Sequence, residues 1–581
     1  MGFLDNYPKL SGVGAEVDAF LRRKHPGFFA ADSVRPYLEL KPRKVIHDGV
    51  WGTFDFTWRE LAILDTPLVQ RLRDIHQIGL AYQVYPSARH SRLEHTLGVL
   101  VMASRIFDAL MAKHRSQVRD SVKVVFGTST DEEVGLRIEQ LKQELRIAAM
   151  LHDVGHSLHS HASERVFGKL QVLKEAAEEL SDFAGKGKGA GEVVSFCVAL
   201  APCLREWMQR AEAKLHKDGT RGVYDGPVDM ENIALLIVGR SKHPFLQFLG
   251  DIISSDIDAD KLDYLLRDST SAGLPLRYDV DMYLYSVQLD LDQMKDGEGA
   301  LEKLYGHTGA TGAERRPADG GSEYPYYEAY RLCLPKRAMH VLEQIVICKM
   351  MLFSYVYHHP KVRAAEGLLE RMLGSLVELL KNSNKNEWEI LEWFLEATDA
   401  DLRLLSRDAA MGTIQETAYR IVNRLLPREI IRLSASEAVG PQKALLAAFL
   451  GKIRDKAKGP GFVKTWETAM GEELRKRPGF EGLSWENALA KAGIWVDVPK
   501  APKFEDTQKV VSRSNSGRDM ASGMFPVHAW QQGYTSYRWY VRVYAYSQFG
   551  VAAKECAKAT MKRLSGIESD DFYKGVERVR F

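Results

Sequence analysis

Four side chains of the kinds that bind metal ions stand in segments that begin or end helical patterns. His95 lies in the segment 91–98, His152 and Asp153 are adjacent in the segment 151–156, and Asp260 lies in the acidic segment 256–268. Because each lies at or near the end of a helical pattern, three helices could bring the four side chains to one point. Two imidazoles and two carboxylates suit a divalent transition ion such as Mn, Fe, Ni or Zn better than calcium. Such an ion acidifies a bound water and polarises a phosphoryl oxygen.

The helix predicted to carry Asp260 has a regular polar stripe. Asp256, Asp260, Tyr264 and Asp268 recur every four residues, so they share one face of a helix, and the remaining positions are rich in leucine. A solvent-exposed charged face is the alternative. An acid, a phenol and a second acid on a strongly apolar helix are more typical of a pocket wall, and we favour that interpretation.

Helical periodicity supplies the elements that must position these residues. Apolar residues recur at spacings of three and four in residues 67–78, 95–112, 134–152, 253–266, 338–357 and 364–380. Two short strands are predicted within residues 44–56, interrupted at Gly49 and Gly52, and another strand is predicted within residues 539–546.

The pattern divides the chain into three parts. Residues 1–43 are predicted to form an N-terminal arm, residues 44–428 a helical core, and residues 429–581 a smaller α+β C-terminal lobe. Glycine-rich insertions near residues 184–191 and 306–324 are typical of loops. The predicted fold class is therefore mostly α, with small β elements.

Composition limits the classes of function. The chain of 581 residues carries 79 Lys+Arg against 77 Asp+Glu, a net charge of +2. No global basic field indicates a nucleic-acid polymer as the main ligand, whereas an anionic small molecule needs only a few local cations. Five cysteines without a CxxC pair disfavour a disulfide framework and a cysteine-rich zinc site. We find no secretory signal and no run of ~18 apolar residues, so we predict a cytoplasmic protein without a membrane partner.

The order of these motifs resembles that of the HD-superfamily deoxynucleoside triphosphate (dNTP) triphosphohydrolases, including the branch with antiviral members and bacterial relatives. The similar blocks are residues 44–48, 65–79, 85–98, 152–164, 258–268 and 356–366, and the resemblance covers about residues 44–428. It implies an HD-domain helical core in which His95, His152, Asp153 and Asp260 hold one divalent metal ion, whether Mn, Fe, Ni, Zn or Mg.

The resemblance also implies contacts to a substrate. Arg92, His156, Lys261 and Lys349 would meet the triphosphate. The family more often has arginine where this chain has Lys349, and lysine keeps the charge but loses the bidentate fork. The implied nucleoside contacts are Gln77 and Ile78 with the sugar and base edge, Tyr264 under the deoxyribose, Asp268 with the 3′-hydroxyl, His161 near the sugar and α-phosphate, and Tyr357 and His358 near the base.

One position departs from the family pattern. The family usually has a His-Glu pair after the HD helix, and that histidine is taken to protonate the leaving 5′-oxygen. The nearest match here is Gly191 followed by Glu192, so the histidine is replaced by glycine. His161 or His156, oriented by Glu164, could take its place as the general acid.

The activity that the resemblance implies is metal-dependent hydrolysis of dNTPs to deoxynucleoside and inorganic triphosphate. One alternative is another HD phosphohydrolase chemistry, that of a nuclease or a nucleotide phosphatase. A second alternative is a dNTP-sensing protein with weakened catalysis, which Gly191 motivates. Control of the dNTP pool and defence against phage are both compatible with the sequence.

A nucleotide-activated oligomer is a further implication of the resemblance. In the family, the positions matching Lys44, Val45, Asp65, Gln70 and Arg73 form a guanine-nucleotide site between subunits. We therefore expect a homo-oligomer with GTP or dGTP as a candidate activator. The alternative is that this block serves helix packing, with Asp65 as a helix N-cap.

Overall fold

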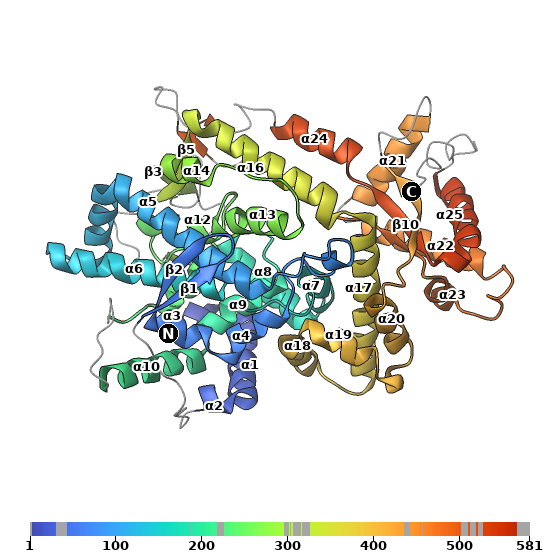
Figure 1. Ribbon diagram of the computed structural model, residues 1–581, viewed down its shortest axis with the longest axis horizontal. Helices are drawn as coiled ribbons and strands as arrows, with labels where there is room; N and C mark the ends of the chain where they lie inside the picture. Colours follow the sequence, from blue (N-terminus) through green and yellow to red (C-terminus); the bar gives the residue numbers. More distant parts are fainter. Residues whose placement is uncertain are drawn as a thin grey trace.

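The computed structural model describes most of the chain. The described residues are 3–30, 43–185, 187–217, 226–295, 301, 304–305, 315–316, 326–434, 442–455, 457–500, 509–511, 519–520 and 527–565. Within them the chain is mostly helical with three small sheets, which confirms the predicted fold class (Figure 1). Most of the predicted insertion near residues 306–324 lies outside the described residues.

The N-terminal segment packs closely onto the rest of the chain. Helix α1 (Pro8–Lys24) lies against α8 (Gln171–Ala184) and α9 (Ala190–Leu200). Its apolar side chains Leu10 and Val13 are fully buried. The segment predicted as an arm thus contributes a helix to the core.

The predicted strand pair after this segment is present. Strands β1 (Arg43–Asp48) and β2 (Gly52–Thr57) pair antiparallel, and Gly52 takes the positive φ of 79° that the turn requires. Thr57 then caps α3 (Trp58–Leu64) in a reciprocal capping box with Glu60.

Two long helices form the centre of the molecule. Ser91 and Thr130 begin α5 (Arg92–Phe126) and α6 (Asp131–Leu151) with capping boxes, and the two helices pack side by side. Helix α13 (Ala259–Ser271) crosses α5. The start of α5, the end of α6 and the start of α13 therefore come together.

Two predicted helices are wrong in part. The segment 253–266 is not one helix, because α12 (Phe248–Ile253) ends and Asp258 caps a new helix, α13. Asp256 consequently lies outside the polar stripe. The segment 67–78 begins as α4 (Pro67–Gln70) and tightens into the 3₁₀ turn η2 (Arg71–Asp74). The chain then becomes extended, so that His76 forms a β-bridge with Ser91.

The C-terminal part is built on a second sheet. Strands β6 (Arg428–Leu433), β10 (Val541–Ala545) and β7 (Trp495–Asp497) pair antiparallel in the order β6-β10-β7, and β10 matches the predicted strand. Helices of the same region gather around this sheet at one end of the molecule (Figure 1). Helix α16 (Met339–Leu352) leads through the π-helical turn η6 (Phe353–Tyr357) into the long helix α17 (Pro360–Asn382).

The third sheet joins β3 (Gln288–Lys295) antiparallel to β5 (Tyr326–Pro335), with Gln288 opposite Cys333. Its smaller strands are β4 (Arg315–Arg316), β8 (Lys509–Val511) and β9 (Asp519–Met520). The remaining helices are α2 (Pro26–Phe29), α7 (His161–Phe167), α10 (Pro202–Lys217), α11 (Met230–Ile237), α14 (Val280–Ser286), α18 (Glu387–Glu396), α19 (Asp399–Leu405), α20 (Thr413–Val422), α21 (Gln442–Arg454), α22 (Gly459–Leu474), α23 (Trp485–Ala492), α24 (Val527–Tyr537) and α25 (Gly550–Ser565).

Among the described residues, two helices are long and apolar enough to cross a membrane by length and composition. They span Arg92–Phe126 and Lys336–Tyr357, and 72% and 44% of their most apolar windows are buried inside the structure. Length and apolar composition alone are weak support for a span, because buried core helices meet the same test.

Candidate metal centre and substrate site

The structure brings the four predicted metal ligands together. His95 lies in the first turn of α5, His152 and Asp153 follow the end of α6, and Asp260 lies in the first turn of α13. His95 Nε2 lies 3.0 Å from Asp260 Oδ1 and 3.6 Å from Asp153 Oδ2, and His152 Nε2 lies 3.5 Å from Asp153 Oδ1. Ligands that share an ion at about 2.1 Å lie about 3–4 Å apart, so this spacing fits one ion.

The chemistry of His152 supports a ligand role. Its Nδ1 contacts the Ala149 carbonyl oxygen at 2.7 Å, which places the proton on Nδ1 and leaves Nε2 unprotonated. Nε2 is buried and has no hydrogen-bond partner among the residues that the structure describes. A buried acceptor of this kind costs free energy unless something binds it, and a divalent ion would satisfy it.

A set of buried side chains orients His95 from behind. His95 Nδ1 lies 2.8 Å from Asp263 Oδ2, and Asp263 in turn accepts hydrogen bonds from Arg267 and from the Trp51 indole. Arg267 also binds Asp48 through two hydrogen bonds of 2.9 and 3.1 Å. A carboxylate on the far nitrogen of a ligand histidine fixes its orientation and increases its basicity.

The charges of the centre favour a cation. Burial by itself lowers the pKa of His95, but hydrogen bonds to Asp260 and Asp263 outweigh burial and raise the pKa to about 10. Burial by itself raises the pKa of Asp153, but the Arg92 guanidinium and the neighbouring imidazoles hold that pKa well below its usual range. The carboxylates therefore stay ionised and attract a positive charge, either a proton on His95 or a metal ion.

Arg92 offers a hydrogen-bond donor beside the metal ligands. Its Nη1 donates to Asp153 and its Nε donates to Ser160 Oγ at 2.9 Å. Its Nη2 is buried and, within the described part of the chain, makes no hydrogen bond. A guanidinium with a spare donor next to a metal centre suits a phosphate oxygen.

His156 lies against the helix that carries Gly191. A Cβ added at Gly191 would lie 3.0 Å from two atoms of the His156 ring, so the glycine makes room for this imidazole at the start of α9. His156 Nδ1 lies 3.3 Å from Asp153 Oδ1. Burial, followed by the nearby Arg92 guanidinium, lowers the pKa of His156 to about 3, so its ring is neutral at neutral pH.

His161 forms a dyad with Glu164 on α7. Its Nδ1 lies 3.0 Å from Glu164 Oε2, while the other carboxylate oxygen accepts the Gly191 backbone N–H at 3.0 Å. The His161 side chain is 71% exposed. Burial by itself raises the pKa of Glu164, but His161 and His156 outweigh it and lower the pKa below the usual range. Glu164 is therefore an ionised carboxylate that orients an accessible imidazole.

Comparison with known proteins agrees with this geometry. Residues 92–220 match the family model described as HD domain. The chain carries an HD domain. The matched range includes three of the four clustered ligands, and Asp260 completes the HD centre from outside it.

Several proteins are similar to the chain over part of its length. Deoxynucleoside triphosphate triphosphohydrolase SAMHD1 homolog of Dictyostelium discoideum is 29% identical over 42% of this chain and 39% of its own length. Human deoxynucleoside triphosphate triphosphohydrolase SAMHD1 is 27% identical over 42% of this chain and 36% of its own. Uncharacterized protein YwfO of Bacillus subtilis is 25% identical over 59% of this chain and 54% of its own length. The similarity thus spans about half or less of these relatives, and supports an HD-domain family that resembles the dNTPases.

Predicted nucleoside contacts gather further along α13 from the HD centre. Asp268 Oδ1 lies 2.8 Å from His90 Nε2, and Asp268 Oδ2 accepts from the Tyr357 hydroxyl at 2.5 Å. Burial, and then Asp268, raise the pKa of Tyr357 well above its usual value, so the phenol keeps its proton. Gln77 is buried, and its Oε1 makes no hydrogen bond to any described residue. Ile78 and Tyr264 are partly buried against the core.

Three other predicted contacts have different surroundings. Lys261 turns back on its own helix start, where Nζ donates to Ser255 O at 2.6 Å and to Asp258 Oδ2 at 2.7 Å. Lys349 is buried on α16, which packs against α13. His358 is buried, and its Nδ1 lies 3.0 Å from the Tyr534 hydroxyl of α24. Of the pair Tyr357-His358, Tyr357 contacts Asp268, whereas His358 contacts Tyr534.

The predicted regulatory residues lie at the surface near β1 and α4. Lys44, Val45, Asp65 and Arg73 are exposed, and Arg73 Nε donates to Gln70 Oε1 at 2.7 Å. Asp65 ends α3, and Thr66 occupies the N-cap position of α4. The alternative interpretation of Asp65 as an N-cap is therefore wrong.

Sequence reasoning missed the residues behind His95. Asp263 and Arg267 are spaced by four, a spacing that pairs an acid with a base on one helix face. That signal was available, but it did not indicate a contact with His95. Trp51 and Asp48 are distant in sequence, and only the fold brings Trp51 to Asp263 and Asp48 to Arg267.

Proposed function

We propose that the protein hydrolyses dNTPs to deoxynucleoside and inorganic triphosphate. The observation that carries the proposal is the convergence of His95, His152, Asp153 and Asp260 beside the unused Nη2 of Arg92. A metal-type centre next to a free guanidinium donor suits a phosphate ester. The SAMHD1 relatives, to which the chain is similar over part of their length, bear the name of this activity.

Helix α13 would span the substrate. A rise of 1.5 Å per residue places Asp268 about 12 Å along the helix from Asp260. Asp260 would face the phosphate end, whereas Asp268 and Tyr357 would bind the sugar hydroxyl through their hydrogen-bonded pair. A nucleotide would therefore lie along α13, with its phosphates near Asp260 and its sugar near Asp268.

The residues of the chain would divide the reaction between them. His95, His152, Asp153 and Asp260 would hold the divalent ion, which supplies the Lewis acidity that acidifies water and polarises a phosphoryl oxygen. Arg92 would bind a triphosphate oxygen with its free Nη2 and neutralise charge that develops there. The fixed orientation of His95 by Asp263 keeps the centre in place for this step.

His161 would act as the general acid. The attacking water releases one proton to solvent as its oxygen forms a bond to the α-phosphorus, and the bond from that phosphorus to the 5′-oxygen breaks. His161 Nε2 gives its proton to the leaving 5′-oxygen, because Nδ1 is engaged by Glu164. His156 is less suited, since it is buried and its pKa is lowered to about 3.

Product analysis tests the proposal. Purified protein is incubated with each dNTP and NTP under Mn²⁺ or Mg²⁺, and the products are separated by chromatography. Triphosphate together with deoxynucleoside supports the proposal. Monophosphates or short oligonucleotides would indicate a different HD phosphohydrolase, and tight dNTP binding without turnover would indicate a sensor.

We expect the double variant H152A/D153A to lose bound metal and activity together. Both side chains are proposed ligands, and removing two of four leaves too few donors for tight binding. Metal content per chain and dNTP hydrolysis are the two measurements. A double variant that keeps a full complement of metal at the HD centre would contradict this assignment.

We expect His161→Gln to reduce hydrolysis of dNTPs by ~10²–10⁴-fold while metal content stays unchanged. The hydrolysis rate of an ester with a nitrophenol leaving group should fall much less in this variant, because that group departs without a proton. His340→Gln, at an exposed histidine on α16, serves as the control. Equal losses for both substrates would show that His161 does not deliver the proton.

Regulation by nucleotide is a second part of the proposal. The exposed residues Lys44, Asp65 and Arg73 combine an acceptor for a guanine edge with two cations for phosphates. A neighbouring subunit would complete this surface, in a homo-oligomer activated by GTP or dGTP.

A further inference from the structure

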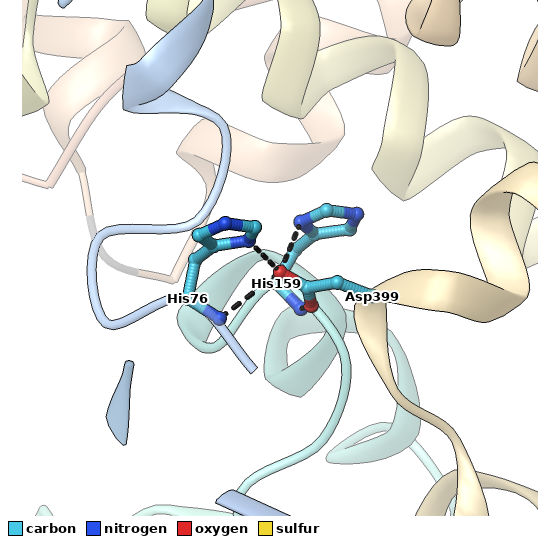
Figure 2. Close-up of side chains that lie close together, drawn as sticks. All are labelled: His76, His159 and Asp399. Carbon is cyan, nitrogen blue, oxygen red and sulfur yellow. Dashed lines mark hydrogen bonds and ion pairs between the residues drawn. The ribbon is translucent and has the colours of Figure 1, made fainter. Parts of the chain in front are cut away.

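A second group of metal-type side chains lies outside the HD centre. His76, between η2 and α5, and His159, in the turn before α7, both direct their rings toward Asp399 at the start of α19 (Figure 2). Their candidate ligand atoms all lie within 4.8 Å of one another. None of the three residues belongs to the contacts that the family resemblance implies.

The nitrogen atoms of both rings meet one carboxylate oxygen. His76 Nδ1 contacts Asp399 Oδ2 closely, and His159 Nδ1 lies 3.2 Å from the same oxygen. The two rings are parallel, with an interplanar angle of 2° and centroids 6.4 Å apart. Each ring thus presents its Nδ1 to the same point beside Asp399, as Figure 2 shows.

His159 is the residue that a simple ion pair leaves unexplained. Its side chain is about 1% exposed, and neither of its ring nitrogens has a properly aligned hydrogen bond to any described residue. Asp399 is already bound, because Oδ1 accepts the His159 backbone N–H at 2.6 Å and Oδ2 accepts that of His76 at 3.0 Å. A buried imidazole whose Nδ1 meets its carboxylate without proper alignment, and whose Nε2 has no partner among the described residues, leaves polar atoms that a bound ion would help to satisfy.

The backbone of this turn is held in an unusual conformation. His159 and Ser160 have positive φ values of 49° and 59°, in a region that non-glycine residues seldom adopt. Such conformations cost free energy and persist where the surroundings enforce them, often at binding sites. Here the conformation places the His159 ring beside Asp399.

We propose that His76, His159 and Asp399 form a second site for a divalent transition ion of the zinc class, separate from the HD centre. Two imidazoles and a carboxylate are a donor set that zinc binds with three protein ligands and an open fourth position. The fourth position would face solvent on the side of His76, whose side chain is 22% exposed.

The ion would join two parts of the chain that are distant in sequence. His76 and His159 belong to turns of the core, whereas Asp399 begins α19. The same turns reach the HD centre, because Ser160 Oγ donates to the His76 carbonyl oxygen at 2.6 Å and accepts from Arg92 Nε at 2.9 Å. The second ion would therefore fasten α19 to the turn that also positions Arg92.

Metal stoichiometry tests the proposal on the full chain. The protein is stripped with a chelator and dialysed against Zn²⁺, and zinc per chain is measured by elemental analysis. The background is H152A/D153A, so that the HD centre contributes no zinc. We expect one zinc per chain in this background and none after His76→Gln or Asp399→Asn is added.

Two controls keep the result interpretable. His340→Gln, at an exposed histidine elsewhere, should leave the zinc content unchanged. Circular dichroism on each variant shows whether it is folded. The variant Asp399→Asn keeps one side-chain oxygen that can accept a backbone N–H, so it preserves part of the local hydrogen bonding. In the background protein, Zn²⁺ should raise the melting temperature, and His76→Gln should abolish that rise. A folded background protein that binds no zinc, or that keeps its zinc after His76→Gln, overturns the proposal.

Discussion

Gly98 sets how closely α13 can approach α5 behind the HD centre. A Cβ added at this position would lie 1.9 Å from Asp263 Oδ1 and 2.3 Å from Arg267 Nη2. Neither atom can move away cheaply, because both side chains are buried and hydrogen-bonded to each other. The absence of a side chain at Gly98 therefore leaves the space that the Asp263 carboxylate needs to reach His95.

We expect Gly98→Ala to weaken metal binding at the HD centre about 10–100-fold, the usual effect of losing a carboxylate behind a ligand histidine. Isothermal titration with Mn²⁺ measures the change. Gly374→Ala is the matched control, since Gly374 is also helical but has open space around its Cβ position. The control should keep its affinity and gain up to about 1 kcal/mol of helix stability. Equal affinities in the two variants would refute the role given to Gly98.

The candidate metal ligands of the HD centre could be predicted from residue types, whereas the residues around them could not. His95, His152, Asp153 and Asp260 could be predicted because each stands at the end of a helical pattern. His76, His159 and Asp399 gave no such signal, since their contact depends on a turn with positive φ and on a residue more than 200 positions away. Local patterns carry no information on such contacts.

At the scale of elements, the start of α13 determines where Asp260 points. Asp258 caps the helix by accepting the Lys261 backbone N–H at 2.8 Å, and it also binds Lys261 Nζ at 2.7 Å. The oxygen that binds Lys261 Nζ, Oδ2, also accepts the Ser255 backbone N–H at 2.9 Å. One side chain thus fixes both the first turn of α13 and the loop before it.

We expect Asp258→Ala to lower the free energy of unfolding by about 0.5–2 kcal/mol and to weaken metal binding, because Asp260 lies in the turn that loses its cap. Ser484→Ala removes the cap of α23, far along the chain, and should cost similar stability without changing metal affinity. Chemical denaturation and metal titration on both variants separate the two effects. A loss of affinity in Ser484→Ala as large as in Asp258→Ala would argue against a local role.

Two helix boundaries were mispredicted for an identifiable reason. In the segment 67–78, the partly buried Arg71 donates to the carbonyl oxygens of Ala397, Val154 and His156. These contacts join parts of the chain that are far apart, and periodicity does not register them. By contrast, the strand pair β1-β2 and the helices α5 and α6 have local signals, namely a glycine turn and capping boxes.

At the scale of the whole molecule, His358 links α17 to the C-terminal part of the chain. Its Nδ1 lies 3.0 Å from the Tyr534 hydroxyl, and its side chain is buried. Burial, and then Arg363, lower the pKa of His358 from 6.5 to about 3. Protonation therefore favours the unfolded chain, where the imidazole regains its usual pKa.

We expect protonation of His358 to lower the free energy of unfolding by about 2 kcal/mol when the pH falls from 7 to 5. Its contribution is fully present above pH 6.5 and is lost progressively as the pH falls toward 3. The stability difference between wild type and His358→Gln should therefore shrink by that amount over the same range. Urea denaturation at both pH values measures it, and a constant difference would contradict the assigned shift.

The packing of α1 has a consequence for synthesis of the protein. Helix α1 ends at Lys24, but its partners α8 and α9 begin only at Gln171 and Ala190. At ordinary rates of translation, roughly 7–30 s pass between the two. During that interval the face formed by Leu10, Val13 and Val17 has no native surface to cover it, so the nascent chain presents an apolar helix that chaperones can bind.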